Sequence, residues 1–247
     1  YNGKNVLVVG MGPAGYTLAH HLLQEGFGVV GIDGLKVEPL STEIVGARRR
    51  VGKPIRDYAE LKQKLDERLL LGFGGVSEYG ITVRWDKNFL DLLYLTLVRR
   101  KKSRIYGGVG FGGCVTTEDA WALGCDHIAL ASGAGRPTIV PMKNNLIGGV
   151  RKASDFLMAL QLSGAYKANG LANLQVQLPA IVIGGGLTAI DTATETLAYY
   201  VVQVEKTLDR VERLAARTSG GEAAVYARMN DEERQTILEF CEHGRAV

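Results

Sequence analysis

The chain has 247 residues, of which 46% are hydrophobic and 22% are charged, and its formal net charge is +3. This balance is typical of a globular protein with one large domain or two small ones, and the small charge gives no reason to expect a nucleic-acid partner. No apolar run approaches the ~20 residues of a membrane span and no signal-peptide pattern opens the sequence, so we expect a cytoplasmic chain.

Cysteine and histidine usage limits the chemistry further. The chain has three cysteines, too few for a four-cysteine iron–sulfur cluster, and no two of them have the close spacing of a redox-active disulfide. Its four histidines lack metal-ligand spacing, so we expect no metal site. The cysteines are Cys114, Cys125 and Cys241, and the histidines are His20, His21, His127 and His243.

A glycine-rich turn follows the first predicted strand. The apolar run at residues 6–9 is typical of a buried parallel strand, and a helical stretch begins after the turn. In a nucleotide-binding turn, the first glycine permits the tight turn, the second lets backbone approach a pyrophosphate, and the third lets helix and strand pack closely. Gly10, Gly12 and Gly15 fill these three roles.

An acidic residue follows at the spacing that a dinucleotide site requires. The run at residues 27–32 is predicted to be the second strand, and Asp33 closes it. A carboxylate about 20 residues after the first glycine binds a ribose hydroxyl in such sites. The first 33 residues therefore predict a dinucleotide site, with a strand–turn–helix unit that binds no ligand as the alternative.

The next hundred residues are less regular. Residues 34–72 are polar and contain two prolines, which is typical of an insertion. The basic runs at residues 48–50 and 99–104 are each interpreted as a solvated surface, with a docking or cofactor-phosphate patch as the alternative. The predicted elements are a helix near residues 58–66, a glycine-rich loop at 72–81, a helix from Asp86 or Lys87, a strand at 105–109, a helix capped by Thr116 and a buried strand at 126–133.

A second glycine-rich turn follows a further apolar run, residues 180–183. Gly184, Gly186 and Ala189 fill the same three roles as the glycines of the first turn. The partner strand is ambiguous: residues 200–204 could form a strand that ends at Glu205, or they could belong to a continuous helix through Arg213. A glutamate at a strand end favours NADH, whereas the neighbouring Lys206 leaves NADPH open.

The rest of the second half is predicted to be helical. A connecting stretch from residue 138 to about 178 contains a helix near residues 153–162, and the charged tail after residue 205 has a helical pattern that is interrupted at residues 219–221.

Taken in order, these motifs resemble the two-dinucleotide-binding flavoprotein superfamily, which has the pyridine nucleotide-disulfide oxidoreductase fold. The resemblance is closest to the NAD(P)H-oxidising small subunit of glutamate synthase and covers residues 1–33 and 72–200. It is carried by Gly-x-Gly-Pro-Ala-Gly at residues 10–15, Asp33, the Gly-Gly…Tyr-Gly-Ile loop, Ala-Ser-Gly-Ala at 131–134 and Gly-Gly-Gly-x-Thr-Ala-x-Asp at 184–191.

The resemblance implies roles for individual residues. The first turn would hold the FAD pyrophosphate through Gly10, Gly12, Pro13, Ala14 and Gly15, and Asp33 would bind the FAD ribose. The groups near the flavin would be Gly74, Gly75, Tyr79, Gly80 and Ile81, with Ser132 and Gly133 where the FAD domain meets the NAD(P) domain. The nicotinamide dinucleotide would be held by Gly184, Gly185, Gly186, Thr188 and Ala189, with Glu205 on its ribose.

Asp191 matches a family aspartate near the contact of flavin and nicotinamide, and it is the one candidate for a catalytic role. The alternative is that its carboxylate only complements the helix dipole.

We therefore expect an α/β protein with two Rossmann-like dinucleotide-binding domains. The FAD-binding domain spans residues 1–145, residues 146–178 connect, and residues 179–247 are a partial NAD(P)-binding domain with a helical tail. The family usually reaches its Gly-Gly loop within a few residues of the acid, whereas Gly74 follows Asp33 by 41 positions here, and we find no closing strand that ends in Gly-Asp. We therefore expect the FAD domain to be incomplete and the chain to belong to a larger protein or complex.

The predicted function is that of an FAD-dependent NAD(P)H oxidoreductase module. Because the chain has neither a disulfide nor a cluster of its own, its electrons would pass to an iron–sulfur or other redox partner. One alternative is a non-catalytic assembly subunit that retains the nucleotide-binding fold. Another is a simple NAD-dependent dehydrogenase, which leaves the second turn unexplained.

Overall fold

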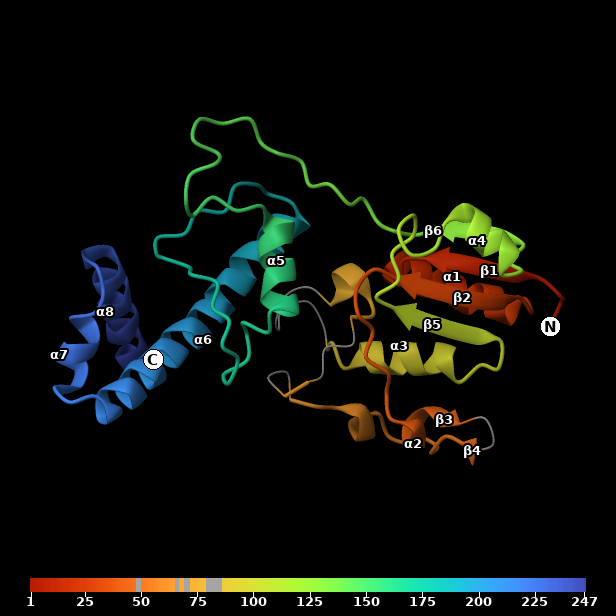
Figure 1. Cartoon of the computed structure of the whole chain (residues 1–247), viewed down its shortest axis with the longest axis horizontal. Coiled ribbons are helices and arrows are strands. Elements are labelled where there is room, and N and C mark those ends of the chain that lie inside the picture. The colour runs from red at the N-terminus through yellow and green to blue at the C-terminus, as the bar shows by residue number, and fades with distance from the viewer. Residues whose placement is uncertain (48–49, 65–66, 69–71, 79–85) are drawn as a thin grey trace. The chain divides into compact units, whose positions relative to one another are not determined.

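The computed structural model describes residues 1–47, 50–64, 67–68, 72–78 and 86–247. These residues form two compact units, the first made of residues 1–78 and 86–138 and the second of residues 139–247 (Figure 1). No helix among the described residues is long and apolar enough to cross a membrane.

The first unit is built on a four-stranded parallel sheet. Its strands are β1 (Asn5–Val9), β2 (Gly28–Asp33), β5 (Ser103–Gly107) and β6 (His127–Leu130). Their order is β5-β2-β1-β6, and β1 pairs in register with both β2 and β6. Parallel order places the carboxyl ends of all four strands at one edge of the sheet.

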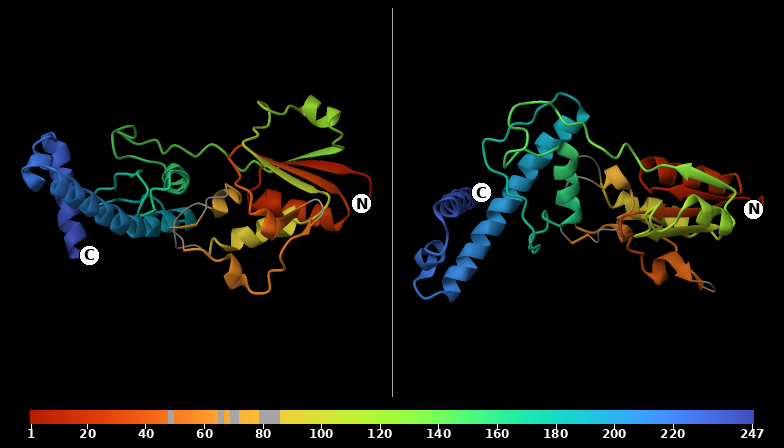
Figure 2. Two further views of the ribbon diagram at one scale, coloured as in Figure 1. Left: turned by 60° about the horizontal axis from the view of Figure 1, so that its bottom comes forward. Right: turned by 45° about the horizontal axis from the view of Figure 1, so that its top comes forward.

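Helices cover both faces of this sheet, as expected for a doubly wound fold. Helix α1 (Pro13–Gln24) and helix α3 (Phe89–Val98) pack together on one face, and α4 (Thr117–Ala122) lies on the other (Figure 2). The alternation of β1 matches this arrangement, because Val6 and Val8 join the core beneath α1 and α3 whereas Leu7 and Val9 join the core beneath α4. The mixed α/β class and its parallel sheet are confirmed.

Strand β6 differs from the expectation of a buried strand. Its four residues are exposed or half-buried, because β6 lies at the edge of the sheet and has only β1 as a neighbour. Among the described residues, only one side of this strand is hydrogen-bonded to the sheet.

The insertion between β2 and β5 carries several short elements. They are α2 (Thr42–Val45), β3 (Gly46–Ala47), β4 (Arg50–Val51), η1 (Tyr58–Leu61) and η2 (Gly75–Ser77). Of the helix predicted near residues 58–66, residues 58–61 form a single 3₁₀ turn with a capping box and residues 62–64 are not helical, while residues 65–66 lie outside the described residues. Arg99, which caps the end of α3, fastens the insertion to this helix, because its guanidinium donates to the carbonyl oxygens of Ile44 and Lys53. One side chain of the basic run is therefore structural.

The described part of the second unit is helical. It contains α5 (Ala153–Leu162), α6 (Leu187–Arg217), α7 (Gly221–Tyr226) and α8 (Asp231–Ala246), and α7 and α8 pack against α6 (Figure 1). The break predicted at residues 219–221 is present, since α6 ends at Arg217 and α7 begins at Gly221.

The strand predicted at residues 180–183 does not form, because these residues pair with no strand among the described residues. Of the two alternatives for residues 200–204, the continuous helix is the one that forms, since they lie inside α6. The helix is favoured because Tyr200 and Val204 are both buried against α8. Residues four positions apart lie on the same face of a helix, so only the helical conformation directs both side chains toward α8. Two Rossmann-like domains are therefore not what the structure describes.

Candidate nucleotide sites

The first glycine turn has the geometry that its spacing predicts. Gly10 follows β1 with a φ of +93°, and a Cβ there would lie 2.5 Å from the carbonyl oxygen of Ala131. A Cβ on Gly15 would lie 1.8 Å from the carbonyl oxygen of Gly10. Both positions therefore admit only glycine, the first because of its turn geometry and both because of close packing.

Asp33 is fixed beside this turn. One carboxylate oxygen accepts a hydrogen bond from the backbone N–H of Met11 at 2.8 Å, and the other accepts from Leu35 N–H at 2.9 Å. Each oxygen keeps a further lone pair, so the carboxylate can accept a ribose hydroxyl while it holds the turn. Met11, which is fully buried, is a participant that the motif alone did not indicate.

The Gly74–Gly75 loop lies against the same turn. The backbone N–H of Gly74 donates to the carbonyl of Met11 at 3.0 Å, and a Cβ on Gly75 would lie 3.0 Å from the Cα of Gly12. The structure thus brings together segments that are about 60 residues apart in sequence. Tyr79, Gly80 and Ile81, predicted for the same region, lie outside the described residues.

Ser132 and Gly133 reach the turn from the other side. The backbone N–H of Ala131 donates to Val9 at 2.8 Å, and the Cα of Ser132 would lie 3.0 Å from a Cβ on Gly10. Gly133 has a φ of +76°. Three predicted segments therefore meet at the carboxyl ends of β1, β2 and β6, where open α/β sheets bind their ligands.

The start of α1 suits an anion. Its N-cap is Gly12, which offers no side chain to the first-turn amides, and Pro13 occupies the first helical position. The first N–H groups of the helix are thus not capped by a side chain, and the helix dipole places partial positive charge at this end. A diphosphate would find backbone donors here.

A buried ion cluster supports the Gly74–Gly75 loop. Arg68 contacts Glu78, the residue that ends η2, and lies 3.5 Å from a carboxylate oxygen of Asp91 on α3. All three side chains are almost fully buried. Burial raises the pKa of Asp91 to about 6, opposed by Arg68 and reinforced by Glu78. Nothing in the sequence pattern indicated this cluster, because its members come from three separate segments.

The second glycine turn keeps part of its predicted geometry. Gly184 has a φ of +140°, and its Cβ would lie 3.3 Å from the Cβ of Ala189, so the close contact between first and third positions is present. Gly186 is the N-cap of α6 and again offers no capping side chain. Gly185 and Thr188 are exposed beside it.

The acid expected for this second site is not at a strand end. Glu205 is exposed in the middle of α6, so the geometry that suggested a ribose ligand is absent there. Asp191 is half-buried, one turn into α6, a position that is compatible with both of its predicted roles.

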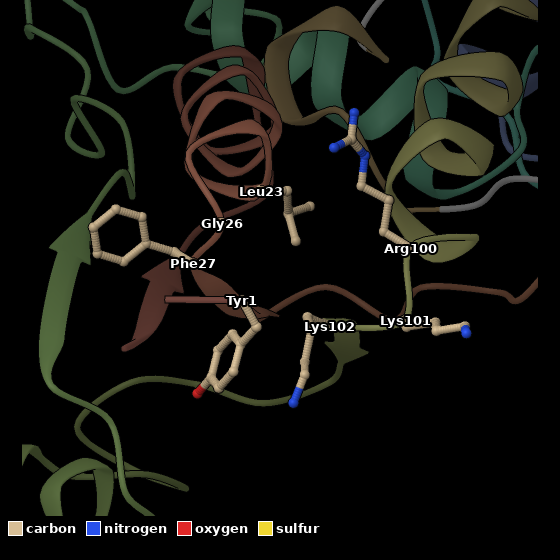
Figure 3. A pocket seen from close by; sticks show the side chains of 7 residues that line it. All are labelled: Tyr1, Leu23, Gly26, Phe27, Arg100, Lys101 and Lys102. Atoms are coloured by element: carbon tan, nitrogen blue, oxygen red, sulfur yellow. The ribbon is translucent and has the colours of Figure 1, made fainter. Parts of the chain in front are cut away.

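Two cavities of the first unit lie away from these turns. One of about 180 Å³ is lined by Tyr1, Leu23, Gly26, Phe27, Arg100, Lys101 and Lys102 (Figure 3). Gly26, Phe27 and Lys102 precede β2 and β5, so this cavity is at the amino ends of the strands. A second cavity, of about 230 Å³, lies between α1 and α3. Neither is at the edge where the glycine turn and Asp33 meet.

Comparison with known proteins identifies the family. Residues 4–234 match the model of the pyridine nucleotide-disulphide oxidoreductase family. The chain belongs to this family. It is also 49% identical, over 202 residues, to a protein of Rickettsia prowazekii (strain Madrid E) described as uncharacterized protein RP006. That match covers 82% of this chain and 28% of the relative, so the chain spans under a third of the relative's length.

Membership of the family supports an oxidoreductase with a flavin-dependent redox role. The three cysteines, Cys114, Cys125 and Cys241, are all free, so this chain shows no disulfide of its own.

Proposed function

We propose that this chain is an FAD-dependent NAD(P)H oxidoreductase module that passes electrons to an iron–sulfur or other redox partner. The observation that carries the proposal is the meeting of the first glycine turn, Asp33 and the Gly74–Gly75 loop at the carboxyl ends of parallel strands. The order of the motifs, which resembles the small subunit of glutamate synthase, supports it further.

The residues present fit a dinucleotide at this edge. Gly10, Gly12 and Gly15 leave no side chain between backbone and ligand, and the uncapped amides of α1 can donate to a diphosphate. Asp33 is already held rigidly and can orient a ribose. A bound FAD would supply the redox chemistry, that is, hydride acceptance from a nicotinamide and release of single electrons.

The second turn would hold the nicotinamide dinucleotide at the start of α6. Gly186 and the amides of the first helical turn would contact its phosphates, as in the first site. The chain itself needs no side chain that transfers a proton in this hydride step, so its task is to position the two nucleotides and exclude water. NADH and NADPH both remain candidates.

The test is a flavin spectrum of the purified full chain. We expect a visible flavin absorbance band that bleaches when NADH or NADPH is added without oxygen. The Asp33→Ala variant should lose at least about tenfold in FAD affinity, because a carboxylate held by two backbone donors is removed. The matched control is Glu118→Gln, which changes an exposed acidic residue on helix α4. A colourless protein that takes up no FAD would refute the proposal.

A second candidate is a non-catalytic assembly subunit. The observation that favours it is the absence, among the described residues, of a strand to support the second turn. Separate titrations with FAD and NADH distinguish the two proposals, since a chain that binds FAD but never a nicotinamide dinucleotide would fit the assembly role.

A further inference from the structure

The segment that leads into the second glycine turn is bound along α6 by a row of side chains. We call residues 170–176 the strap. Alternate strap residues use their backbone groups: Gly170 accepts from Arg210, Ala172 accepts from Lys206 at 3.0 Å, and Val176 pairs with Gln203. Tyr199 adds a contact from one turn nearer the start of α6, since its hydroxyl accepts from the N–H of Leu174 at 2.7 Å.

The spacing of these contacts explains the arrangement. Two residues of extended chain span about 6.6 Å, whereas one turn of α-helix rises about 5.4 Å, so Gly170 and Ala172 can meet Arg210 and Lys206, which lie one turn apart on α6. Val176 meets Gln203 further toward the start of the helix, whereas the contact of Leu174 with Tyr199 departs from this spacing. The strap therefore runs antiparallel to the helix.

Gln203 makes two hydrogen bonds to a single strap residue. Its amide oxygen accepts from the N–H of Val176 at 2.8 Å, and its amide nitrogen donates to the carbonyl of the same residue at 2.9 Å. Gln203 is fully buried, and Val176 is also buried. One side-chain amide thus satisfies both backbone groups of a residue, as a neighbouring strand would do in a sheet.

This pairing matters because residues 177–186 lead directly from Val176 into the second turn. A strand–turn–helix unit needs the incoming segment to run antiparallel beside the helix that leaves the turn. From Gln203 back to Leu187 the helix measures about 24 Å, and ten extended residues span at most about 36 Å, so residues 177–186 use about two thirds of their full reach to return to the start of α6. In the described second unit, side chains of α6 fix the strap, from which this path begins.

We propose that Gln203 is a positioning residue for the second glycine turn, which it holds in register with α6 through the strap. The inference rests on the proposed function only in naming the nicotinamide dinucleotide as the ligand of that turn. The positioning can be measured without a ligand. The backbone N–H groups of Ala189 and Ile190 donate to the carbonyl of Gly186 in the first turn of α6, so their hydrogen exchange reports whether this turn is held in place.

The experiment is amide hydrogen exchange on the full chain, compared between wild type and the near-isosteric variant Gln203→Leu. We expect protection of the Val176 amide to fall by about tenfold or more, because a buried N–H loses its acceptor. Protection of the Ala189 and Ile190 amides should fall with it. The matched control is Glu212→Gln, an exposed change on the same helix, and Tyr199→Phe should produce the same pattern more weakly.

NADH titration then separates this inference from the proposed function. If wild type binds NADH, Gln203→Leu should weaken binding about fivefold or more while FAD binding is unchanged, since a displaced turn loses aligned backbone donors. If wild type binds no nicotinamide dinucleotide, but the Gln203→Leu substitution still lowers the protection of the Ala189 and Ile190 amides, the proposed function fails and the positioning role stands. Loss of protection at Val176 alone, with these first-turn amides unaffected, would overturn the positioning role. Gln203→Glu, which keeps the acceptor for Val176 N–H, should restore part of the protection.

Discussion

The two glycine turns have the same spacing but different supports. The first is held between paired strands, with β1 bonded to both β2 and β6, and Asp33 fixes the backbone at Met11. The second follows an extended segment held by the side chains of α6, through Tyr199, Gln203 and Lys206. A turn built on a sheet is constrained by backbone on all sides, whereas a turn held by side chains is constrained mainly along one helix face. This difference predicts how each turn tolerates change.

The largest effect is expected from Gly15→Ala. The added Cβ would meet the carbonyl oxygen of Gly10 at 1.8 Å, which neither the strand nor the helix can relieve without moving. We expect the unfolding free energy to fall by about 3 kcal/mol or more, measured by urea denaturation. Gly12→Ala is the matched control, because its Cβ would have no neighbour closer than 3.7 Å. Equal stability of the two variants would show that the sheet does not confine this turn.

At alkaline pH, an effect is expected from the support of the second turn, because this support includes the amine of Lys206. Burial, with a contribution from Arg210, lowers the pKa of Lys206 from 10.5 to about 8. Between these values the unfolded chain holds a proton that the folded chain has lost, so stability rises with pH. The gain is complete above pH 10.5 and is lost as pH falls through about 8.

The size of this effect is about 3 kcal/mol across the window, from the shift in pKa. The comparison is wild type against Lys206→Met in urea denaturation at about pH 8 and pH 10.5, because the variant carries every other titrating group. We expect the pH dependence of the variant to be smaller by this amount. A variant with the same pH dependence as wild type would show that the buried amine is not what titrates.

The smallest effect is expected from Gly186→Ala in the second turn. Its φ is −87°, which any residue adopts, and a Cβ there would have no atom within 4 Å. The only cost is a poorer N-cap for α6, so the unfolding free energy should change by less than about 1 kcal/mol. Thermal unfolding beside Gly15→Ala measures the contrast directly. A large loss at Gly186 would mean that the second turn is as closely packed as the first.

Local sequence patterns predicted much of the first unit. The run of apolar residues before Gly10, the three glycines and the acid at position 33 are short-range features, and the structure places all of them as predicted. Thr116 caps α4 as its capping box requires, and the helix at residues 153–162 has the predicted bounds. These features were predictable because each depends on residues within a few positions of one another.

Patterns did not decide the outcome where a distant partner did. Residues 200–204 fit either a strand or a continuous helix by their pattern, and α8 makes the helical spacing of Tyr200 and Val204 the favourable one. The polar row of Tyr199, Gln203 and Lys206 resembles a solvated helix face, but the strap buries it. The Arg68 cluster likewise has no local signature, since its members come from separate segments.

The sequence by itself determined the class of this protein, the first glycine turn and the acid beside it. These depend on the steric freedom of glycine and on the short range of turn and cap geometry. Only the tertiary structure decided that Gly74–Gly75 and Ser132 meet that turn, that Glu205 lies in a helix, and that side chains of α6 guide the chain into the second turn. Those outcomes depend on which distant groups satisfy buried backbone donors and acceptors, and that choice is made only when the chain packs.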